Sequence, residues 1–517
     1  MECQHLKKLC LALLVQTAAL AAAAPAMAVT YNLRADRTTI TLPGPDGVPV
    51  TVPVWGFADD GNTPGSGTVT VPGPKLSVTA GDTLTINLVN RLPVPVSLVI
   101  PGQRIVPNAN PPGAANYDAS VPAANISQNP NFPVPVQPIA PTQRVRSFTT
   151  EAAPNGGSAV YNFGVAKTGT FLYESGTNPA LQIPMGLHGA LVVGPGASGA
   201  AYTPTATNSA TSYDRDQVLL FGEILARYDF TLNRFFTMNE DVDRNSCVTA
   251  ATDTGSCSQW KTPLPYPLTI TTDNSIKSTL DYQPLYYLIN GKSYPDTVAA
   301  QPISTAPGAP TVPGIYAPYG TAGRTLLRMI NAGGQSRVPT IQGSYRDNSS
   351  TDPALALPRA IYPQPIAEDG NLYPYPKQEF APILPAGKTM DVMLNLTGAG
   401  HPGYYTLYDR TLGVTNAGHF PGGMLSFLAS WDPNTRNCSP FKGDLNGDGI
   451  ITISDAVLAL RKVVGNQYDA NGDVSPVVNG LPCGSSTGPT TGTKTALDIT
   501  DSLFILQKAV GTAPQPY

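Results

Sequence analysis

Apolar and polar residues alternate with a period of two along most of the chain, and turns containing glycine or proline separate the runs. Strands show this period because successive side chains point to opposite faces of a sheet. Between about residues 30 and 195 the runs fall at 38–42, 83–88, 96–100, 160–165 and 191–193. Between about residues 217 and 431 they fall at 217–221, 285–290, 324–331, 389–396 and 424–428. The pattern predicts a mainly β protein with two sandwiches.

The pattern changes after Cys438, where two short amphipathic segments replace the strands. The first predicts a helix over 454–464, with Ser454 as its N-cap and Gly465 at its end. The second lies 46 residues later and repeats the first. The matching positions are Asp455, Val457, Leu458, Leu460, Lys462, Val464 and Gly465, and Asp501, Leu503, Phe504, Leu506, Lys508, Val510 and Gly511. We therefore expect a small α-helical module over 438–517.

The composition agrees with a β protein that has many turns and long surface loops, since the chain has 53 prolines, 49 glycines and only 13% charged residues. A segment rich in Pro, Asn and Ala over 104–157 predicts a long loop, and 198–212 predicts a polar linker. The expected sandwich domains are 29–197 and 213–432. The net charge of −4 gives no electrostatic reason to expect a nucleic acid or an anionic membrane as partner.

The first 28 residues predict a signal peptide. Lys7 and Lys8 precede an apolar run over 9–24, and Ala-Met-Ala at 26–28 fits the small-x-small cleavage rule. We therefore expect an exported protein, located in the periplasm, on the cell surface or outside the cell, with a mature start near Val29. Because no further apolar run is long enough to cross a bilayer, we do not expect a membrane-spanning protein.

Four cysteines remain after the signal peptide, and an even number in an exported chain favours disulfides. The two local pairs are Cys247 with Cys257 and Cys438 with Cys483. Metal thiolates are the alternative, but no C-x-x-C spacing and no neighbouring histidine supports them.

The sharpest motif is the segment 444–455, which has the composition of a calcium-binding loop. Calcium takes oxygen ligands from a loop that turns sharply around it, and Gly449 permits the turn. The expected ligands are Asp444, Asn446, Asp448, the carbonyl of Ile450, Thr452 and Asp455. A second loop would begin at Asp473 and end at Asp498 and Asp501, but residues 475–495 interrupt it. We expect one calcium ion and leave the second open.

Several segments also carry a specific family resemblance. Those in the first block are Val-Pro-Gly-Pro at 71–74, Gly-Asp-Thr-Leu at 81–84, 90–98, Thr-Gly-Thr-Phe-Leu-Tyr at 168–173, and 184–193. Together they resemble the first cupredoxin (plastocyanin-like) domain of multicopper oxidases. The second domain of that family is resembled by 288–291, 326–331, 367–370 and 387–392. The resemblance covers most of 40–430 and implies two Greek-key β-sandwiches.

The same resemblance locates the family's copper ligands, which this sequence replaces. An active member continues after 90–98 as His-x-His-Gly, where this chain has Val-Ile-Pro-Gly at 99–102. An active member also carries His-x-His after the tyrosine at 173, where Glu-Ser-Gly stands at 174–176. The family's His-Cys-His segment of a third domain is missing too. We therefore do not expect a competent copper centre.

The remaining chemistry is sparse. Beyond the signal peptide the histidines are His188, His401 and His419, fewer than a blue copper and three further coppers require. A single weak copper at His401 and His419 is the alternative. The carboxylate pair Glu368–Asp369 is expected to be structural.

The duplicated helices and the calcium loop resemble a dockerin, a small docking module with two calcium loops. That resemblance implies a protein partner, by analogy a cohesin-type receptor. The interpretation that fits best is a non-catalytic binding or scaffold protein that docks through this module. The alternative is an enzyme, namely an oxidoreductase of the multicopper oxidase family with a non-standard copper or other metal site. Glycoside chemistry, which often accompanies dockerins, finds no supporting residues in the body.

Overall fold

The structure is a computed structural model. It describes residues 27–44, 48–105, 147–196, 199–208, 210–229, 234–237, 239, 242–243, 282–298, 300–302, 311–318, 323–342, 363–395, 403–431, 443, 445, 451–467, 469, 472, 474, 477–478, 481–482, 497 and 499–510.

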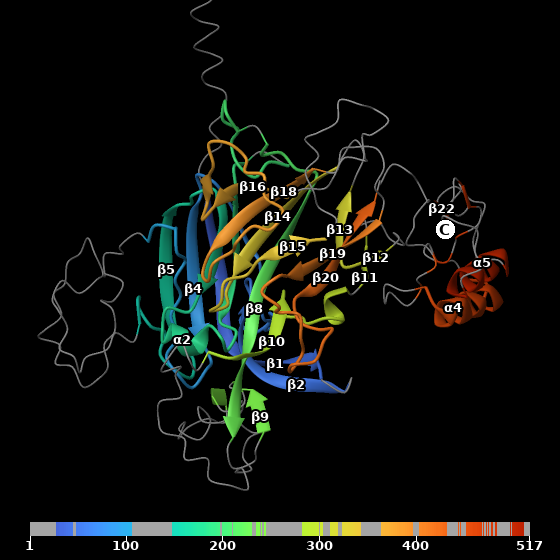
Figure 1. The fold of residues 1–517 in the computed structure, drawn as a ribbon. Helices are drawn as coiled ribbons and strands as arrows, with labels where there is room; N and C mark the ends of the chain where they lie inside the picture. The colour runs from blue at the N-terminus through green and yellow to red at the C-terminus, as the bar shows by residue number, and fades with distance from the viewer. Residues whose placement is uncertain are drawn as a thin grey trace, which may run out of the picture.

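The first sandwich is built from two sheets that enclose a shared core (Figure 1). The larger sheet has the order β2-β1-β4-β5 and contains β1 (Ala28–Pro43), β2 (Pro49–Asp59), β4 (Thr83–Asn90) and β5 (Gly157–Val165). The smaller sheet has the order β3-β7-β6 and contains β3 (Leu76–Thr79), β6 (Gly169–Glu174) and β7 (His188–Gly194). The short helix α2 (Pro179–Gln182) connects β6 to β7. The chain changes sheet between β2 and β3, between β3 and β4, and between β5 and β6.

The second sandwich also has two sheets around one core. Its larger sheet has the order β10-β8-β14-β18-β16-β17. It contains β8 (Arg215–Asp229), β10 (Pro284–Ile289), β14 (Arg324–Asn331), β16 (Pro363–Glu368), β17 (Asn371–Leu372) and β18 (Thr389–Asn395), with β9 (Arg234–Thr237) beside β8. Its smaller sheet contains β13 (Ile315–Pro318), β20 (Leu425–Trp431), β19 (Gly403–Asp409) and β15 (Pro339–Ile341). The strands β11 (Ala300–Pro302) and β12 (Thr311–Pro313) form a separate ladder, preceded by a short 3₁₀ helix (Asp296–Val298).

The mainly β fold predicted from the sequence is confirmed, and each predicted run but one lies in or overlaps an observed strand. The exception is 96–100, which makes only isolated bridges, from Val96 to Ala152 and from Val99 to Glu174. Pro95 and Pro101 bracket this run, and proline cannot donate to a ladder, so a regular strand does not form.

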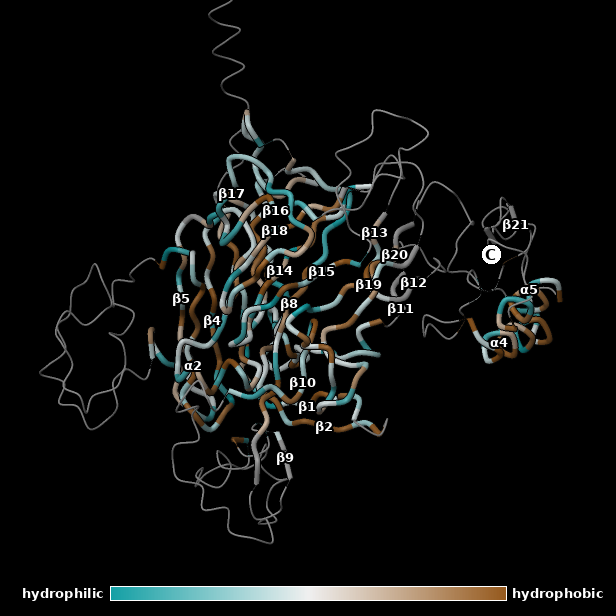
Figure 2. Tube along the Cα trace, viewed as in Figure 1, coloured by the Kyte–Doolittle hydropathy of each residue, from teal (hydrophilic) through white to brown (hydrophobic). Residues whose placement is uncertain are grey.

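The two sandwiches share apolar and polar contacts. Leu42 and Val52 from the β1–β2 hairpin pack with Tyr286 and Leu288 of β10 in one buried cluster. In a second contact region the Asp391 carboxylate accepts hydrogen bonds from the Thr170 hydroxyl, at 2.6 Å, and from the Tyr202 hydroxyl, at 2.5 Å. The strands of both sandwiches therefore lie side by side in Figure 1, and Figure 2 shows many hydrophobic residues along them.

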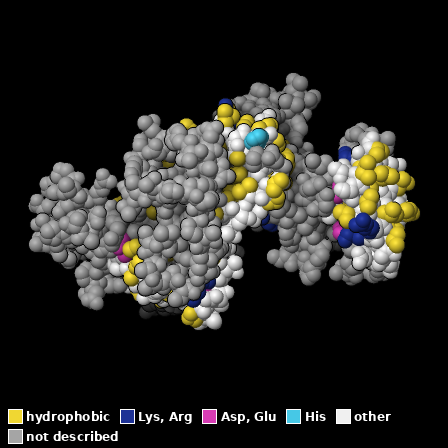
Figure 3. Space-filling model, turned by 90° about the horizontal axis from the view of Figure 1, so that it is seen from below, with side chains coloured by type: hydrophobic (Ala, Val, Ile, Leu, Met, Phe, Trp, Pro, Cys, Tyr) yellow, Lys and Arg dark blue, Asp and Glu magenta, His cyan; other side chains and the backbone are white. Residues whose placement is uncertain are grey.

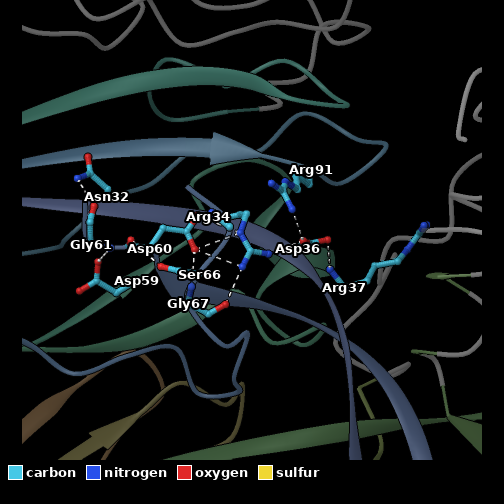
Figure 4. Close-up of polar contacts among 11 residues, drawn as sticks. Asn32, Arg34, Asp36, Arg37, Asp59, Asp60, Gly61, Ser66, Gly67 and Arg91 are labelled. Carbon is cyan, nitrogen blue, oxygen red and sulfur yellow. Dashed lines mark hydrogen bonds and ion pairs between the residues drawn. The ribbon is translucent and has the colours of Figure 1, made fainter. Parts of the chain in front are cut away.

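A buried arginine fixes the turn after β2 (Figure 4). The Arg34 guanidinium donates to the Asp60 carboxylate at 3.1 Å and to the Gly67 carbonyl at 2.7 Å. Burial alone would raise the pKa of Asp60, but Arg34 and the N–H groups of Gly65 and Gly67 hold the pKa of that carboxyl below its usual range. Both charged groups therefore hold the turn in place.

The C-terminal part contains two helices, α4 (Ile453–Val464) and α5 (Ile499–Ala509), and the short strands β21 (Val477–Val478) and β22 (Leu481–Pro482). Ala459 of α4 and Ile505 of α5 meet in a small buried cluster with Val474 and Leu497. The predicted helices are confirmed, but the N-cap of α4 is Thr452 and not Ser454. Asp455 explains the difference, because its carboxylate accepts the Thr452 N–H at 2.8 Å and closes a capping box there.

Within the part of the chain that the structure describes, no helix is both long enough and apolar enough to cross a membrane.

Candidate functional site

The two segments that would carry copper ligands in the first sandwich lie side by side. Val99 and Glu174 form an antiparallel bridge, with N–H to carbonyl distances of 2.9 and 3.0 Å in the two directions. Residues directly opposite each other on antiparallel strands have side chains on the same face. The two segments are therefore neighbours, as the family resemblance implies, and the side chains that share this face are those of Val99 and Glu174.

Little space is left for a side chain at Gly176 on this face. A Cβ atom at this position would lie 2.8 Å from the Val99 Cγ1 atom and 2.9 Å from the Ser97 hydroxyl. Real Cβ contacts are essentially never that short, and a β-branched valine has little freedom to move away. A larger side chain at 176, including histidine, therefore requires Val99 or Ser97 to shift.

Beneath this face, hydroxyl groups cross-link the same segments. The Thr177 hydroxyl lies 2.9 Å from that of Ser97, 3.1 Å from that of Ser147 and 3.2 Å from a carboxylate oxygen of Glu151. The Ser97 and Ser147 hydroxyls are themselves 2.9 Å apart, and Ser147 donates to the Thr149 carbonyl. Ser97, Ser147 and Thr177 are buried. Buried hydroxyls need such partners, so this cluster has a structural explanation.

Glu174 is the one side chain of a ligand type among the four replaced positions Val99, Pro101, Glu174 and Gly176. Its carboxyl is half-buried, and burial raises its pKa to about 7. Among the described residues, no hydrogen bond or ion pair reaches this carboxylate. A carboxyl in this state can exchange a proton near neutral pH, and this is the only acid–base capacity at the four positions.

His188 lies opposite Glu174 in the β6–β7 ladder. Its ring is buried, with Nδ1 at 3.1 Å from the Ile183 carbonyl, and burial lowers the pKa of the imidazole to about 4. Its Nε2 faces Gly222 of the second sandwich, 3.7 Å from where a Cβ would stand. The ring therefore packs between the sandwiches as a neutral group.

These residues do not fit copper. A blue copper site needs two imidazoles and a thiolate, and further coppers need more imidazoles. Of Val99, Pro101, Glu174 and Gly176, only Glu174 offers a donor side chain, and a longer side chain at 176 would require Val99 or Ser97 to shift. Across the described parts of the chain, no group of three or more His, Cys, Asp or Glu side chains is arranged to hold a metal ion.

Other predicted site residues are placed only in part. His419 is exposed in the loop before β20, and its proposed copper partner His401 lies outside the described residues. So do Cys247, Cys257, Cys438 and Cys483, so both disulfides stay predictions. The pair Glu368–Asp369 has the structural role expected of it. Lys388 pairs with both carboxylates, and its hydrogen bond, with that of Tyr373, holds the pKa of Glu368 below the usual range.

Of the first calcium loop, the structure describes Thr452 and Asp455 and brings them together. The buried Asp455 carboxylate accepts the Leu445 N–H at 2.9 Å and the Thr452 hydroxyl at 3.0 Å. The other expected ligands, which lie outside the described residues, are Asp444, Asn446, Asp448 and Ile450. Asp455, at the last position of the loop, thereby holds the backbone of Leu445, at its second position.

The second, interrupted loop is closed in the same way. The buried Asp501 carboxylate accepts the Val474 N–H at 3.1 Å. Asp455 and Leu445 are 10 residues apart, whereas Asp501 and Val474 are 27 apart. Its other expected ligands, Asp473 and Asp498, lie outside the described residues. The equivalent aspartates thus hold equivalent N–H groups despite the insertion.

The helices expose an apolar face that the sequence reasoning did not single out. Eight large aliphatic side chains on it are between 40% and 82% exposed. We call these eight residues the twin stripe: Ile453, Val457, Leu460 and Val464 on α4, and Ile499, Leu503, Leu506 and Val510 on α5. Figure 2 shows many hydrophobic residues along this helix pair, and Figure 3 shows hydrophobic side chains gathered on its surface. The signal was available in the sequence as the same 4-3-4 spacing in both repeats.

No family model matches the chain, and no curated protein matches it. Among solved structures it is similar to the blue copper oxidase from Nitrosomonas europaea, at 18% identity and a TM-score of 0.46, over 80% of this chain and 89% of that one. It is similar to the multicopper oxidase mgLAC at 17% identity and a TM-score of 0.43, over 78% and 86% of the two chains. It is also similar to a copper nitrite reductase from Nitrosomonas europaea, at 16% identity and a TM-score of 0.42, over 78% and 95%. At such identities and TM-scores, the likeness assigns this chain neither a copper centre nor an activity.

Proposed function

We propose that this chain is an exported, non-catalytic binding or scaffold protein of the cell envelope or extracellular space. The observation that carries the proposal is the face formed by Val99 and Glu174. Two segments that resemble copper-ligand segments meet there without imidazoles, and a histidine at 176 would require Val99 or Ser97 to shift. The fold of the body is kept while the donor atoms for copper chemistry are replaced.

The body is suited to a scaffold role because its two sandwiches share buried contacts. Asp391 of the second sandwich holds Thr170 of the first, and the hairpin residues Leu42 and Val52 pack under β10. Arg328 reaches across the same region, with its guanidinium 3.1 Å from the Thr170 hydroxyl and 2.8 Å from the Asp216 carboxylate. Such a joint holds the two sandwiches in one relative position.

The docking element in this proposal is the module over 438–517, folded around calcium. Its ligands would be Asp444, Asn446, Asp448, Ile450, Thr452 and Asp455, with a possible second site at Asp473, Asp498 and Asp501. The tie from Asp455 to Leu445 supports a closed loop, and the twin stripe supports a protein partner. By analogy with dockerins, that partner belongs to the cohesin-type class.

Metal analysis of the purified mature protein tests this function. After incubation with Cu(II) and dialysis, we expect calcium but less than stoichiometric copper, no intense blue absorption and no oxidation of a phenolic substrate. A known multicopper oxidase treated in parallel is the positive control. Stoichiometric copper together with phenol turnover would refute the proposal.

The alternative function is an oxidoreductase with a non-standard metal site, and Glu174 is the observation that favours it. A half-buried carboxyl with a pKa near 7 is the kind of group that active sites use. Glu174→Gln separates the two functions. If a metal-dependent turnover exists and this variant abolishes it while the fold is unchanged, the alternative is correct.

A further inference from the structure

We propose that the twin stripe is a self-association face, through which two copies of this chain join their α4–α5 pairs into a four-helix bundle. The inference rests on the proposed docking module over 438–517: where no cohesin-type receptor covers this face, a second copy of the chain does. The juxtaposition that supports it is the pairing of α4 and α5 around Ala459 and Ile505, with an apolar seam left uncovered on each helix.

The size of the uncovered area is the first argument. Val464 is 82% exposed, and even Leu506, the least exposed member of the twin stripe, is 40% exposed. The eight side chains together expose on the order of 800 Å², about what each partner contributes to a standard protein–protein interface. The largest apolar patch on a typical monomer is smaller, roughly 300–600 Å². A face of this extent is therefore expected to be covered in solution.

The spacing of the stripe is the second argument. On α4 the exposed residues follow one another at intervals of four, three and four, from Ile453 to Val464. On α5 the same intervals lead from Ile499 to Val510. This is the spacing of a helix–helix seam, in which residues of one helix insert between residues of a facing helix. The spacing therefore favours a helical partner over a flat sheet.

The internal repeat is the third argument, and it selects a second copy. Each member of the stripe on α4 has an aliphatic counterpart 46 residues later on α5. An interface between identical chains brings one patch onto itself, so every position must be compatible with its own set of partners. A face made of two equivalent, uncharged aliphatic rows meets this condition throughout. Two such pairs also satisfy the usual two-layer arrangement of a bundle core.

Among the described residues of the module, the charges around the twin stripe do not oppose the contact. Lys462 is bound to Asp469 at 3.1 Å, on the side of α4 away from the stripe's exposed row. Asp455 and Asp501, the acidic residues in the first turns of α4 and α5, are fully buried. The exposed cation beside the stripe is Arg461, whose counterpart in the second repeat is the neutral Gln507.

Sedimentation velocity of the mature full-length protein in calcium, over roughly 1–100 µM, tests the inference. We expect a monomer–dimer equilibrium in the wild type. The double variant Leu460→Asp/Leu506→Asp should weaken it by at least about 100-fold, because two charges would be buried in the seam. Leu412→Asp, at an exposed position on the second sandwich, is the matched control and should leave the dimer unchanged. Calorimetric calcium titration of each variant checks that the module still folds, since the replaced side chains are exposed.

Each outcome decides the matter. Loss of the dimer in the double variant alone, with calcium binding retained, supports self-association. A wild type that stays monomeric over this range, or a dimer that the double variant keeps, overturns it. If the monomeric protein instead binds a cohesin-type receptor through Leu460 and Leu506, the proposed docking function stands while the self-association inference fails. If calcium does not bind, the proposed function itself fails.

Discussion

The face around Glu174 and the helix pair α4–α5 are both built from two segments that the fold brings together. They differ in whether side chains of a metal-ligand type stand at the equivalent positions of the two segments. In the first sandwich Val99 and Glu174 pair through their backbones, and the sequence reasoning predicts that metal-binding side chains have been replaced at these positions. In the helix pair the buried aspartates Asp455 and Asp501 remain in equivalent places, although residues 475–495 interrupt the second loop.

The difference shows what maintains each region. A sandwich core of Trp55, Phe57 and Phe171 stabilises the first region whether or not a ligand is present. The helix pair has a small core around Ala459 and Ile505, and helices of 11 and 12 residues are marginal on their own. A region with its own large core can keep its fold without a metal site. A region with a small core is expected to need further stabilisation, which the predicted calcium ion, the predicted disulfide or a partner would supply.

Removing calcium should give the largest effect, because it should unfold the helix pair and leave the sandwiches folded. The calcium loop predicted from the sequence would bring Asp444, Asp448 and Asp455 together, and each close carboxylate pair without a cation would cost on the order of a few kcal/mol. We therefore expect chelation to abolish amide-exchange protection in α4 and α5 and to leave the sandwich strands protected. Hydrogen exchange with mass spectrometry measures both regions in one sample.

The variant Asp448→Ala should reproduce this effect with calcium present, and magnesium alone should not restore protection. Unchanged protection of α4 and α5 after chelation would mean that the module does not depend on calcium. Loss of protection in β4 or β14 at the same time would mean that the two regions are not independent.

The predicted disulfide Cys438–Cys483 should give the next largest effect, again in the helical module alone. It would close a loop around the first calcium site and constrain the unfolded chain by roughly 4 kcal/mol on the chain-entropy model. Cys438→Ser/Cys483→Ser should therefore raise the calcium concentration at the midpoint of folding. Peptide mapping without reduction should find Cys438 linked to Cys483 and Cys247 linked to Cys257. Free thiols at all four positions would contradict the assignment.

Gly176→Ala should have a smaller effect, in the first sandwich. The added Cβ would contact Val99 and Ser97 at distances that force one of them to move, which costs about 1–3 kcal/mol in the free energy of unfolding. Gly194→Ala is a matched control at the end of β7, because a Cβ there has nothing within 4 Å. Urea unfolding of both variants gives the comparison. Equal stability of the two variants would show that the face around Gly176 has room to rebuild a ligand.

The sequence predicted the strands because period-two alternation is a local signal, and it failed at 96–100 because two prolines interrupt the ladder there. The narrow space at Gly176 was not predictable, since its neighbour Ser97 is far away in the chain. The twin stripe was missed for a different reason. Leu458 and Leu460 are equally apolar in the sequence, and only the packing of α4 on α5 makes Leu460 the exposed one.

The smallest effect is expected from titration of Glu174, and its sign can be worked out. Burial raises the pKa of this carboxyl from an ordinary value of 4.5 to about 7. The folded state therefore holds a proton that the unfolded state has already released between these two values. Stability from this group is fully present below pH 4.5 and is lost as the pH rises through 7. His188 acts in the opposite sense, because its pKa is lowered to about 4 and its contribution is lost as the pH falls from 6.5 toward that value.

Between pH 4.5 and 6.5 the stability contribution of Glu174 falls with rising pH, while that of His188 rises. The two changes offset each other in the wild type, so its unfolding free energy alone would not reveal either one. Subtracting the wild-type free energy of unfolding from that of Glu174→Gln removes the His188 contribution, which both proteins share. The difference should be near zero at pH 4.5 and rise to about 1–2 kcal/mol in favour of the variant by pH 8, a value reduced from the full shift because the carboxyl is partly exposed. Urea unfolding at half-unit pH intervals measures it. A difference that stays flat with pH would show that Glu174 is solvated, and a difference that favours the wild type at high pH would show that a cation binds its carboxylate, which would revive the metal site that this face otherwise excludes.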